Sequence, residues 1–391
     1  MFFRSSFDSV LGDAAWRERE RFRRRRELAL QAVIAFVIVV TVVALAVNVR
    51  ANLDARHIQS GFGFLFQRAG FEVSDKLIAF TSASAVWKGF LVGLLNTLRV
   101  AALTIVTATM LGVVVGLMRL SRNALLRFLG AAHVEIYRNI PLLVLLLAIY
   151  LTVSELLPGV REAVGISGWI YLSKSGLVFA VPQWGEMAVV GSLAVGALLG
   201  AWVSHAAQRR TTRQLAAFYG LAACLGSATV LWFVFGMLGG WNQPQPTRFS
   251  ISGGVQLTPE FVTLWLGLTL FTSASIAEIV RAGVLSVRTD QWLAGMALGL
   301  TYGETTSYVV FPQALKLIMP PLSSQYMSLT KNSSLAVLVG YPDLVNIGTT
   351  VMNVTGQAIE VIFIIMSVYL VINLLISLAM NGLNQRIMQG Q

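Results

Sequence analysis

The stretch LVGLLNTLRVAALTIVTATMLGVVVGL (residues 91–117) decides the fold class, because it is predominantly apolar and has one charged residue, Arg99. A helix needs about 20 predominantly apolar residues to cross a bilayer. Seven further apolar stretches complete the set of candidate spans, at 28–48, 140–157, 188–204, 215–238, 261–282, 316–339 and 358–380. We therefore predict an all-α membrane protein with about eight transmembrane helices.

The composition supports this class. Of the 391 residues, 56% are hydrophobic and 12% are charged, and the mean hydropathy is +0.71. A soluble domain has about a quarter charged residues. One cysteine excludes an internal disulfide and a cysteine-based metal or redox site, and three scattered histidines argue against a metal enzyme. The net charge of +11 would suggest a nucleic-acid partner in a soluble chain, but loops that stay on the cytoplasmic side explain it better.

The distribution of Lys and Arg predicts the orientation. With the N-terminus inside, the cytoplasmic segments contain 19 of these residues and the outer loops contain 8. The positive-inside rule then places both termini in the cytoplasm, as an even number of spans requires. The arginine-rich run at 17–26 fits a topological anchor for a retained first helix, and the alternative is an arm that binds anionic lipid or RNA.

The seventh span is unusually polar. It contains Pro320 and Pro321, followed by the run Lys331, Asn332, Ser333 and Ser334. A charged side chain at the centre of a bilayer costs about 2.5–3.5 kcal/mol on insertion scales. We predict a broken helix whose polar run faces a translocation pathway or its gate. The alternative is a kinked, packed helix in which Lys331 makes a structural ion pair.

Two Glu/Arg pairs lie near cytoplasmic ends of spans. Glu135 and Arg138 precede the third span, and Glu278 and Arg281 end the sixth. Residues three apart share a helix face, so each pair could form a local structural ion pair. The alternative is a cross-helix arrangement, Glu135 with Arg281 and Arg138 with Glu278, that braces a gate.

The stretch 283–316 is too long for a simple turn between the sixth and seventh spans. We predict a short helix at 291–300 that ends at Gly299, and a second helix at 303–311 before Pro312. Such a helix-turn-helix suits docking to a soluble cytoplasmic partner. The alternative is an amphipathic helix in the membrane interface without a partner.

The spacing in 293–312 resembles the signature of binding-protein-dependent ABC importer permeases, Glu-Ala-Ala, three residues, Gly, nine residues, then Ile-x-Leu-Pro. ALGL (297–300) and FPQAL (311–315) are similar to the amino-acid branch. Four further elements of that branch occur in the expected order: GLLNTLRVA (93–101), EIYRNIPLL (135–143), AEIVRAG (277–283) and KNSSL (331–335). The enlarged layout resembles one permease of the general L-amino acid, or glutamate/glutamine/aspartate/asparagine, importers.

The resemblance implies a five-helix core of the type I importer, to which an N-terminal helix and an inserted helical hairpin are added. The segments are then a basic N-terminus (1–27), the extra helix (28–48), a periplasmic loop (49–90), the first part of the core (91–157), the insertion (158–260), the second part of the core (261–382) with a coupling loop (283–312), and a tail (383–391). It assigns ATPase coupling to Leu293, Ala294, Gly295, Gly299 and Pro312, and it adds Asn96 and Thr97 to the pathway or gate.

One departure from the signature matters. Leu293 replaces the glutamate and Gly295 replaces the second alanine. Since Leu293 cannot accept a hydrogen bond, docking would rest on shape and apolar contact, and a second, different permease would retain the glutamate.

The resemblance also implies the partners and the location. The partners are that second permease, two copies of a cytoplasmic ATPase, a periplasmic amino-acid-binding protein and membrane lipids, in a bacterial inner membrane. ATP and magnesium would bind the ATPase, and this chain would have no cofactor, metal or catalytic residue. It lacks the GxxxxGK[ST] loop that holds nucleotide phosphates, and no hydrolase motif is recognisable. The alternative is an ion-coupled secondary transporter, which would need inverted repeats and deep carboxylates.

Overall fold

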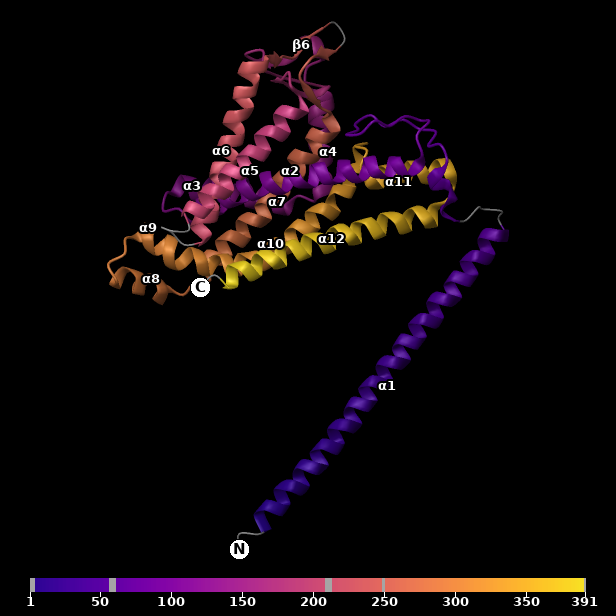
Figure 1. The fold of residues 1–391 in the computed structure, drawn as a ribbon, viewed down its shortest axis with the longest axis vertical. Helices are drawn as coiled ribbons and strands as arrows, with labels where there is room; N and C mark the ends of the chain where they lie inside the picture. The colour runs from indigo at the N-terminus through magenta and orange to yellow at the C-terminus, as the bar shows by residue number, and fades with distance from the viewer. Residues whose placement is uncertain (1–3, 56–60, 208–212, 248–249, 390–391) are drawn as a thin grey trace. The chain divides into compact units, whose positions relative to one another are not determined.

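The computed structural model describes residues 4–55, 61–207, 213–247 and 250–389. The chain forms two units, Met1–Phe62 and Gly63–Gln391. Helix α1 (Arg4–Ala55) makes up most of the first unit (Figure 1). Its side chains from position 22 to position 45 are all exposed, and most of them from position 28 onward are apolar. A helix that is apolar on every side is typical of a segment surrounded by lipid.

Six helices among the described residues are long and apolar enough to span a membrane. They are Phe22–Leu45, Val86–Leu120, Met187–Ala207, Ala222–Gly239, Pro259–Leu285 and Ala358–Gln385. They confirm the all-α membrane class and overlap six of the eight predicted spans. The other two predicted spans differ from the structure in form.

The predicted third span, 140–157, is one arm of a bent pair. Helix α3 (Ala124–Asn139) and helix α4 (Leu142–Leu151), which a π-helical turn η2 (Thr152–Leu156) extends, meet at an angle of 102°. Pro141 lies at the bend, and the residue before a proline is pushed out of the helical conformation. Ile140 is indeed extended, with ψ at 126°.

The predicted seventh span, 316–339, forms helix α10 (Phe311–Asn332) and a 3-10 turn η5 (Ser333–Leu338). A break at the prolines was the wrong prediction, because the helix runs through Pro320 and Pro321 and changes its winding only at Ser333. Each proline removes one backbone hydrogen bond. Buried neighbours in the same core cluster, Met319 and Leu322, stabilise the turn that the prolines weaken.

The segment between the sixth and seventh spans is a helical hairpin. Helix α8 (Thr289–Ala297) is followed by helix α9 (Tyr302–Glu304), which continues through a π-helical turn η4 (Thr305–Val310) into α10. The prediction that the second helix ends before Pro312 is therefore wrong. The wider π turn that precedes Pro312 gives its ring more room than a regular turn would.

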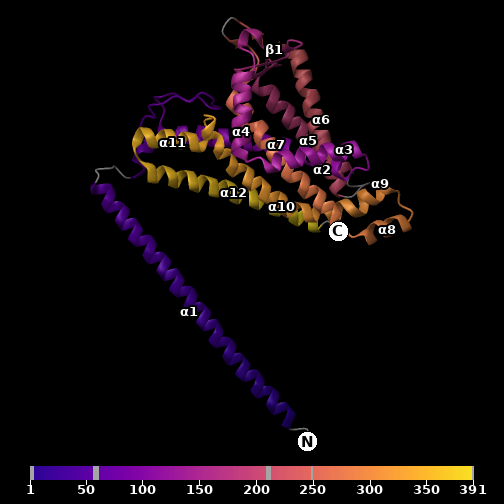
Figure 2. The ribbon, with the colours of Figure 1, turned by 180° about the vertical axis from the view of Figure 1, so that it is seen from behind.

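Helices α2 (Val86–Leu120) and α7 (Pro259–Leu285) form the centre of the second unit. Two glycines of α2 let the backbones approach closely. A Cβ atom at Gly112 would lie 2.7 Å from Ile276, and one at Gly116 would lie 2.9 Å from the carbonyl oxygen of Ala277. Helix α11 (Leu344–Thr355) packs beside α2, and helix α12 (Ala358–Gln389) packs beside α10, as both views show (Figures 1 and 2).

A loop precedes α2 and packs against it. It begins with the 3-10 turn η1 (Phe62–Phe66), and its buried side chains Phe64 and Phe80 belong to the same core cluster as Val92 and Leu344. The segment therefore forms part of the core of the second unit.

The insertion contains short strands and a helical hairpin. A 3-10 turn η3 (Val160–Glu162) precedes the strands β1 (Val164–Ile166), β2 (Ile170–Ser173), β3 (Gly176–Phe179), β4 (Val181–Pro182), β5 (Trp241–Asn242), β6 (Gln245–Pro246), β7 (Ile251–Ser252) and β8 (Val255–Leu257). One antiparallel sheet has the order β1-β2-β3-β8, and β4 pairs with β5 and β6 with β7. In that sheet Phe179 lies opposite Val255. The two ends of the segment between these residues are therefore neighbours.

Helices α5 (Glu186–Ala207) and α6 (Arg213–Gly239) form this hairpin (Figure 2). Glycines allow close contact between them. A Cβ atom at Gly196 would lie 2.8 Å from the carbonyl oxygen of Cys224, and one at Gly200 would lie 2.5 Å from that of Gly220. Small residues at helix interfaces are a common means of packing in membranes.

Candidate functional site

The α8–α9 hairpin presents apolar side chains at its tip. Leu293, Met296 and Leu298 are exposed, and Leu298 keeps 82% of its accessible surface. Exposed apolar patches of this kind mark contact surfaces. Among the coupling residues that the resemblance assigned, Leu293 lies on this surface, as does Ala294.

The other assigned coupling residues shape the hairpin. Gly295 is buried, and a Cβ there would lie 2.6 Å from Thr305, so only glycine allows α8 to pack on η4. Gly299 has φ at +81°, the left-handed conformation that favours glycine. Pro312 is buried at the start of α10.

Aromatic and polar contacts hold the hairpin in shape. The rings of Trp292 and Tyr302 stack with centroids 5.1 Å apart, and the Arg122 guanidinium lies 5.4 Å from the Tyr302 ring. Thr301 caps α9, and its hydrogen bonds lower the pKa of the Glu304 carboxyl. These contacts therefore fix the conformation of the hairpin next to its exposed tip.

The second half of α10 has a polar, exposed face. Ser324, Ser328 and Lys331 are exposed and are spaced four and three residues apart, so they share a face. On the other side, Leu322 and Leu329 are buried. A polar exposed stripe on a helix next to membrane spans indicates contact with water or with another protein. Ser328 was not predicted from the sequence, although its spacing from Lys331 signals the stripe.

The four predicted pathway residues at the end of α10 differ in how exposed their side chains are. Lys331 lies on the polar face, Asn332 and Ser334 are half-buried, and Ser333 is 1% exposed. The Ser333 hydroxyl donates to the Thr330 carbonyl over 2.8 Å. Ser333 thus lies inside the unit because the winding changes to 3-10 at this position.

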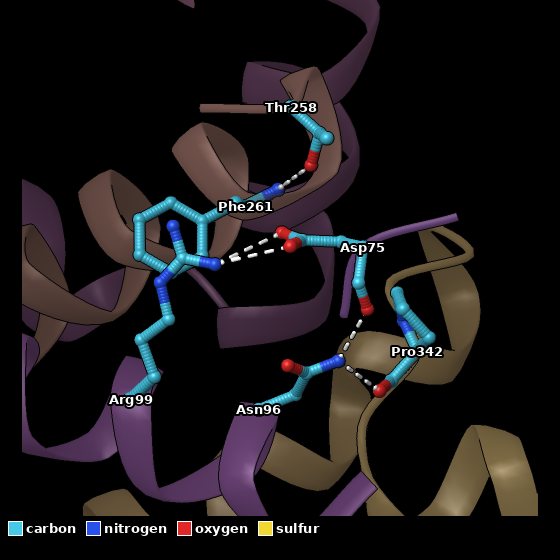
Figure 3. Close-up of polar contacts among 6 residues, drawn as sticks. All are labelled: Asp75, Asn96, Arg99, Thr258, Phe261 and Pro342. Atoms are coloured by element: carbon cyan, nitrogen blue, oxygen red, sulfur yellow. Dashed lines mark hydrogen bonds and ion pairs between the residues drawn. The ribbon is translucent and has the colours of Figure 1, made fainter. Parts of the chain in front are cut away.

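Asn96 and Thr97, the other predicted pathway residues, are fully buried in a polar network near the start of α2, and Figure 3 shows the contacts of Asn96. Asn96 Nδ2 donates to the backbone carbonyls of Asp75, at 2.8 Å, and Pro342, at 2.9 Å. The Thr97 hydroxyl accepts from the Leu344 amide over 3.1 Å. Both side chains therefore hold the preceding loop and the start of α11 against α2.

Charge reinforces this network. The Arg99 guanidinium pairs with the Asp75 carboxylate at 3.1 Å and lies 4.4 Å from the centroid of the Phe261 ring (Figure 3). These residues come from the loop before α2, from α2 and from α7. The sequence places Arg99 within a span but does not indicate its partner, because Asp75 lies in a loop without a motif.

Asp343 is a buried carboxyl in the same region, in the loop between η5 and α11. It is 1% exposed and accepts a hydrogen bond from the Asn346 amide at 2.8 Å, and the Tyr369 hydroxyl donates to it over 3.4 Å. Burial raises the pKa of Asp343 to about 7, above the usual range of an aspartate. This residue was not predicted from the sequence, although an aspartate directly before an apolar run is a helix-capping signal.

One of the two predicted local Glu/Arg pairs is present, and an arginine from another helix joins it. Glu278 pairs with Arg281 on its own helix at 3.0 Å, and it also pairs with Arg119 of α2. The Glu135 carboxylate accepts from the Asn139 side chain at 3.2 Å. The ion pair between helices is therefore made by Arg119 and Glu278. The alternative prediction had placed such pairs between Glu135 and Arg281 and between Arg138 and Glu278.

Beside this cluster lies a cavity of about 510 Å³ between α3, α7 and α10, which we name the α3–α7–α10 cavity. Its polar lining comes from Arg138, Ser275, Glu278, Ser286 and Gln325. Its volume lies within the range of about 300–1,000 Å³ that is typical of small-molecule sites. No group of three or more metal-ligating side chains occurs among the described residues.

Comparison with known proteins identifies the family. The family described as "Binding-protein-dependent transport system inner membrane component" matches residues 108–389, which include α10, the α8–α9 hairpin and the cavity. The chain belongs to this family. As a member it is an ABC transporter permease, a membrane protein with several transmembrane helices, as its motifs predicted.

Three curated relatives extend the match beyond that segment. The general L-amino acid transport system permease protein AapQ of Rhizobium johnstonii is 40% identical over 347 residues, 87% of each chain. The putative amino-acid ABC transporter permease protein YhdX of Escherichia coli is 44% identical over 349 residues, 87% of this chain and 88% of the relative. The glutamate/glutamine/aspartate/asparagine transport system permease protein BztB of Rhodobacter capsulatus is 34% identical over 378 residues, with the same coverage.

Proposed function

We propose that this chain is one of two different permease subunits of an ATP-driven amino-acid importer. The observation that carries the proposal is the exposed apolar tip of the α8–α9 hairpin, Leu293, Met296 and Leu298, in a chain whose relatives are named as amino-acid permeases. The tip docks a cytoplasmic ATPase, with both termini of the chain in the cytoplasm. The polar face of α10 lines one half of the pathway, and the second permease supplies the other half.

The cycle follows from this arrangement. A periplasmic binding protein delivers the amino acid, and two copies of the ATPase bind ATP and magnesium and close. Closure moves the hairpins of the two permeases, and the pathway opens to the outside and then to the inside. In such a cycle this chain only has to change between two conformations, whose relative stability its partners alter. The chemical step, ATP hydrolysis, takes place on the ATPase.

The missing glutamate shapes the docking contact. Leu293 offers an apolar side chain where a carboxylate would offer a charge-assisted hydrogen bond. The contact therefore depends on burial of the hairpin tip, and the second permease carries the polar contact.

The test uses the assembled complex of both permeases and the ATPase in proteoliposomes. Leu298→Ser should reduce co-purification of the ATPase and ATP-driven uptake of L-glutamine, because it removes the most exposed apolar side chain of the tip. Leu126→Ser, at another exposed apolar position, on α3, is the matched control. Normal ATPase binding by the Leu298 variant overturns the docking role. Uptake driven by an ion gradient without ATP overturns the importer.

A further inference from the structure

Four consecutive arginines directly precede the apolar part of α1. Arg23, Arg24, Arg25 and Arg26 are all exposed. Successive residues of an α-helix are turned by about 100° around its axis and advance about 1.5 Å along it. The four side chains therefore leave the helix on all sides, within roughly 4.5 Å of its length. We name these four residues the arginine ring.

The apolar stretch that follows the arginine ring has the length of a bilayer core. Residues 28–47 contain no charged residue. A helix of about 20 residues is about 30 Å long, which equals the thickness of the hydrocarbon layer. Helix α1 runs without a break through both segments, from Arg4 to Ala55. When residues 28–47 fill the hydrocarbon, Arg26 lies roughly 3 Å beyond its edge, so the ring lies at the level of the lipid phosphates.

Two members of the ring have no acidic neighbour on the helix. Residues three or four apart share a helix face. Glu27 is four residues from Arg23 and three from Arg24, so it offsets one of these two charges. The positions three and four residues from Arg25 and from Arg26 contain no acidic residue. Since arginine stays charged in proteins, these two carry positive charge for which α1 has no counter-charge at that spacing.

We propose that the arginine ring binds the phosphates of anionic phospholipids in one leaflet, and that Arg25 and Arg26 make the direct contacts. A guanidinium group donates two parallel hydrogen bonds to a pair of phosphate oxygens. Basic clusters next to a membrane span attract anionic lipids. The apolar part of α1 is exposed on every side, which favours lipid as its neighbour. The positive-inside rule places this leaflet on the cytoplasmic side. The site belongs to α1 alone and is independent of the transported substrate and of ATPase docking.

The experiment measures which lipid lies next to α1 in the full-length chain, in nanodiscs of phosphatidylcholine. Cys224→Ala removes the native cysteine, and Ala29→Cys carries a bimane fluorophore about one turn from Arg25 and Arg26. Trace phosphatidylglycerol with a nitroxide near its headgroup quenches the fluorophore where this lipid is enriched. Phosphatidylcholine with the same nitroxide is the reference. The anionic lipid should quench about fivefold more effectively or better, since one basic residue near an anionic surface contributes roughly fivefold in binding. A fluorophore at Leu45→Cys, near the other end of the apolar stretch, should show no preference.

Paired variants test the two arginines. Arg25→Gln together with Arg26→Gln should lower the preference to less than about twofold, because both direct contacts are lost. Arg23→Gln together with Arg24→Gln changes the net charge by the same amount and should have a smaller effect, because Glu27 already offsets one of these charges. Arg25→Lys together with Arg26→Lys should retain most of the preference. If the glutamine variants fail to insert, the comparison of the two fluorophore positions needs no arginine variant.

The outcomes separate the alternatives. Equal quenching by the two lipids at position 29, or the same preference at positions 29 and 45, overturns the lipid site. An equal loss in the two glutamine pairs leaves only attraction to the net charge and overturns the direct contacts. Loss of the preference when a micromolar RNA oligonucleotide is added assigns the ring to nucleic acid and also overturns the proposal. Amino-acid uptake by a complex without the lipid preference refutes only this site, and the preference in a complex that imports no amino acid refutes only the proposed function.

Discussion

At the scale of single residues, the second unit contains a partly buried ion pair and a buried carboxyl. Arg99 and Asp75 neutralise one another. Asp343 has no cation as a partner in the described part of the chain and is stabilised only by hydrogen bonds. An unpaired buried carboxylate is costly, so the protonated form is favoured and the pKa rises.

Asp343 predicts a pH-dependent stability. Its pKa of about 7 lies above the value of an unfolded aspartate, so the folded protein binds the proton more tightly. Stability from this group is full at acid pH and is lost as the pH rises through about 7. The thermal midpoint of the purified chain in detergent should fall between about pH 5 and about pH 8, and the fall should be smaller in Asp343→Asn.

The control for this prediction is Glu72→Gln. A backbone hydrogen bond from Ser82 lowers the pKa of Glu72, so this group titrates below the window and its removal should leave the slope unchanged. Parallel profiles for the wild type and Asp343→Asn would show that the carboxyl is already ionised across the window.

The Arg119–Glu278 pair predicts a coupled effect. Glu278→Gln leaves two arginines without their counter-charge and should destabilise the chain by about 1.5 kcal/mol, the lower end for charged hydrogen bonds at a partly exposed site. Adding Arg119→Met should recover part of the loss, since both partners of the α2–α7 link are then absent. Thermal unfolding of the double-mutant cycle measures the coupling. Glu135→Gln, at an exposed position, is the control, and additivity of the two changes would disprove the link.

At the scale of elements, glycine and proline determine how the helices meet. Proline bends the α3–α4 pair and is accommodated in α10, while glycine brings α2 onto α7 and α5 onto α6. The same residue type thus acts differently according to the space around it. Gly200 lies at a close contact, whereas a Cβ atom at Gly226, on the facing helix α6, would meet no atom within 4 Å.

This contrast predicts two opposite outcomes in one hairpin. Gly200→Val should separate α5 from α6 and destabilise the hairpin by about 1–3 kcal/mol, because a side chain would overlap the Gly220 carbonyl. Gly226→Val should change stability little. Protease resistance of the 186–239 segment in detergent is the measurement. Equal resistance in both variants would mean that the helices do not pack through Gly200.

The sequence predicted the elements better than their junctions. Apolar length was sufficient for six of the eight predicted spans, and the left-handed Gly299 was a sound signal for the end of α8. Whether Pro312 and Pro320 end a helix depends on the turns and core contacts around them, which no local pattern contains. The site shows the same limit. Glu278 and Arg281 were recognisable as a local pair, but the second partner of Glu278 is Arg119, which comes from another helix.

At the scale of the whole molecule, the second unit contains a set of core helices and, between α4 and α7 along the chain, a segment of short strands with a helical hairpin. The core comprises α2, the α3–α4 pair, α7, α10 and α12, and the insertion adds α5, α6 and short strands. The insertion contributes two spans, an even number, so its presence does not change the side on which the following helix begins. The polar face of α10 and the α3–α7–α10 cavity are formed by core helices only.

This organisation predicts that the insertion is dispensable for the core. Residues 180–254 can be replaced by Asn-Gly, because Phe179 and Val255 are antiparallel partners that a two-residue turn can join. The shortened chain should insert, assemble with its partners and retain uptake. Membrane fractionation and the uptake assay test this, with scrambling of 108–117 as a control that breaks α2. Loss of assembly in the deletion variant would assign the α5–α6 hairpin to the core.

The pairing of β3 with β8 also bears on how such a chain can change over generations. A segment whose two ends are adjacent can be gained or lost in one recombination event, and the protein that surrounds it keeps its shape. A segment of a different length between these two strands then needs no compensating substitutions elsewhere in the protein. For the same reason a laboratory can fuse an epitope or a fluorescent reporter between Phe179 and Val255 and leave the rest of the gene untouched.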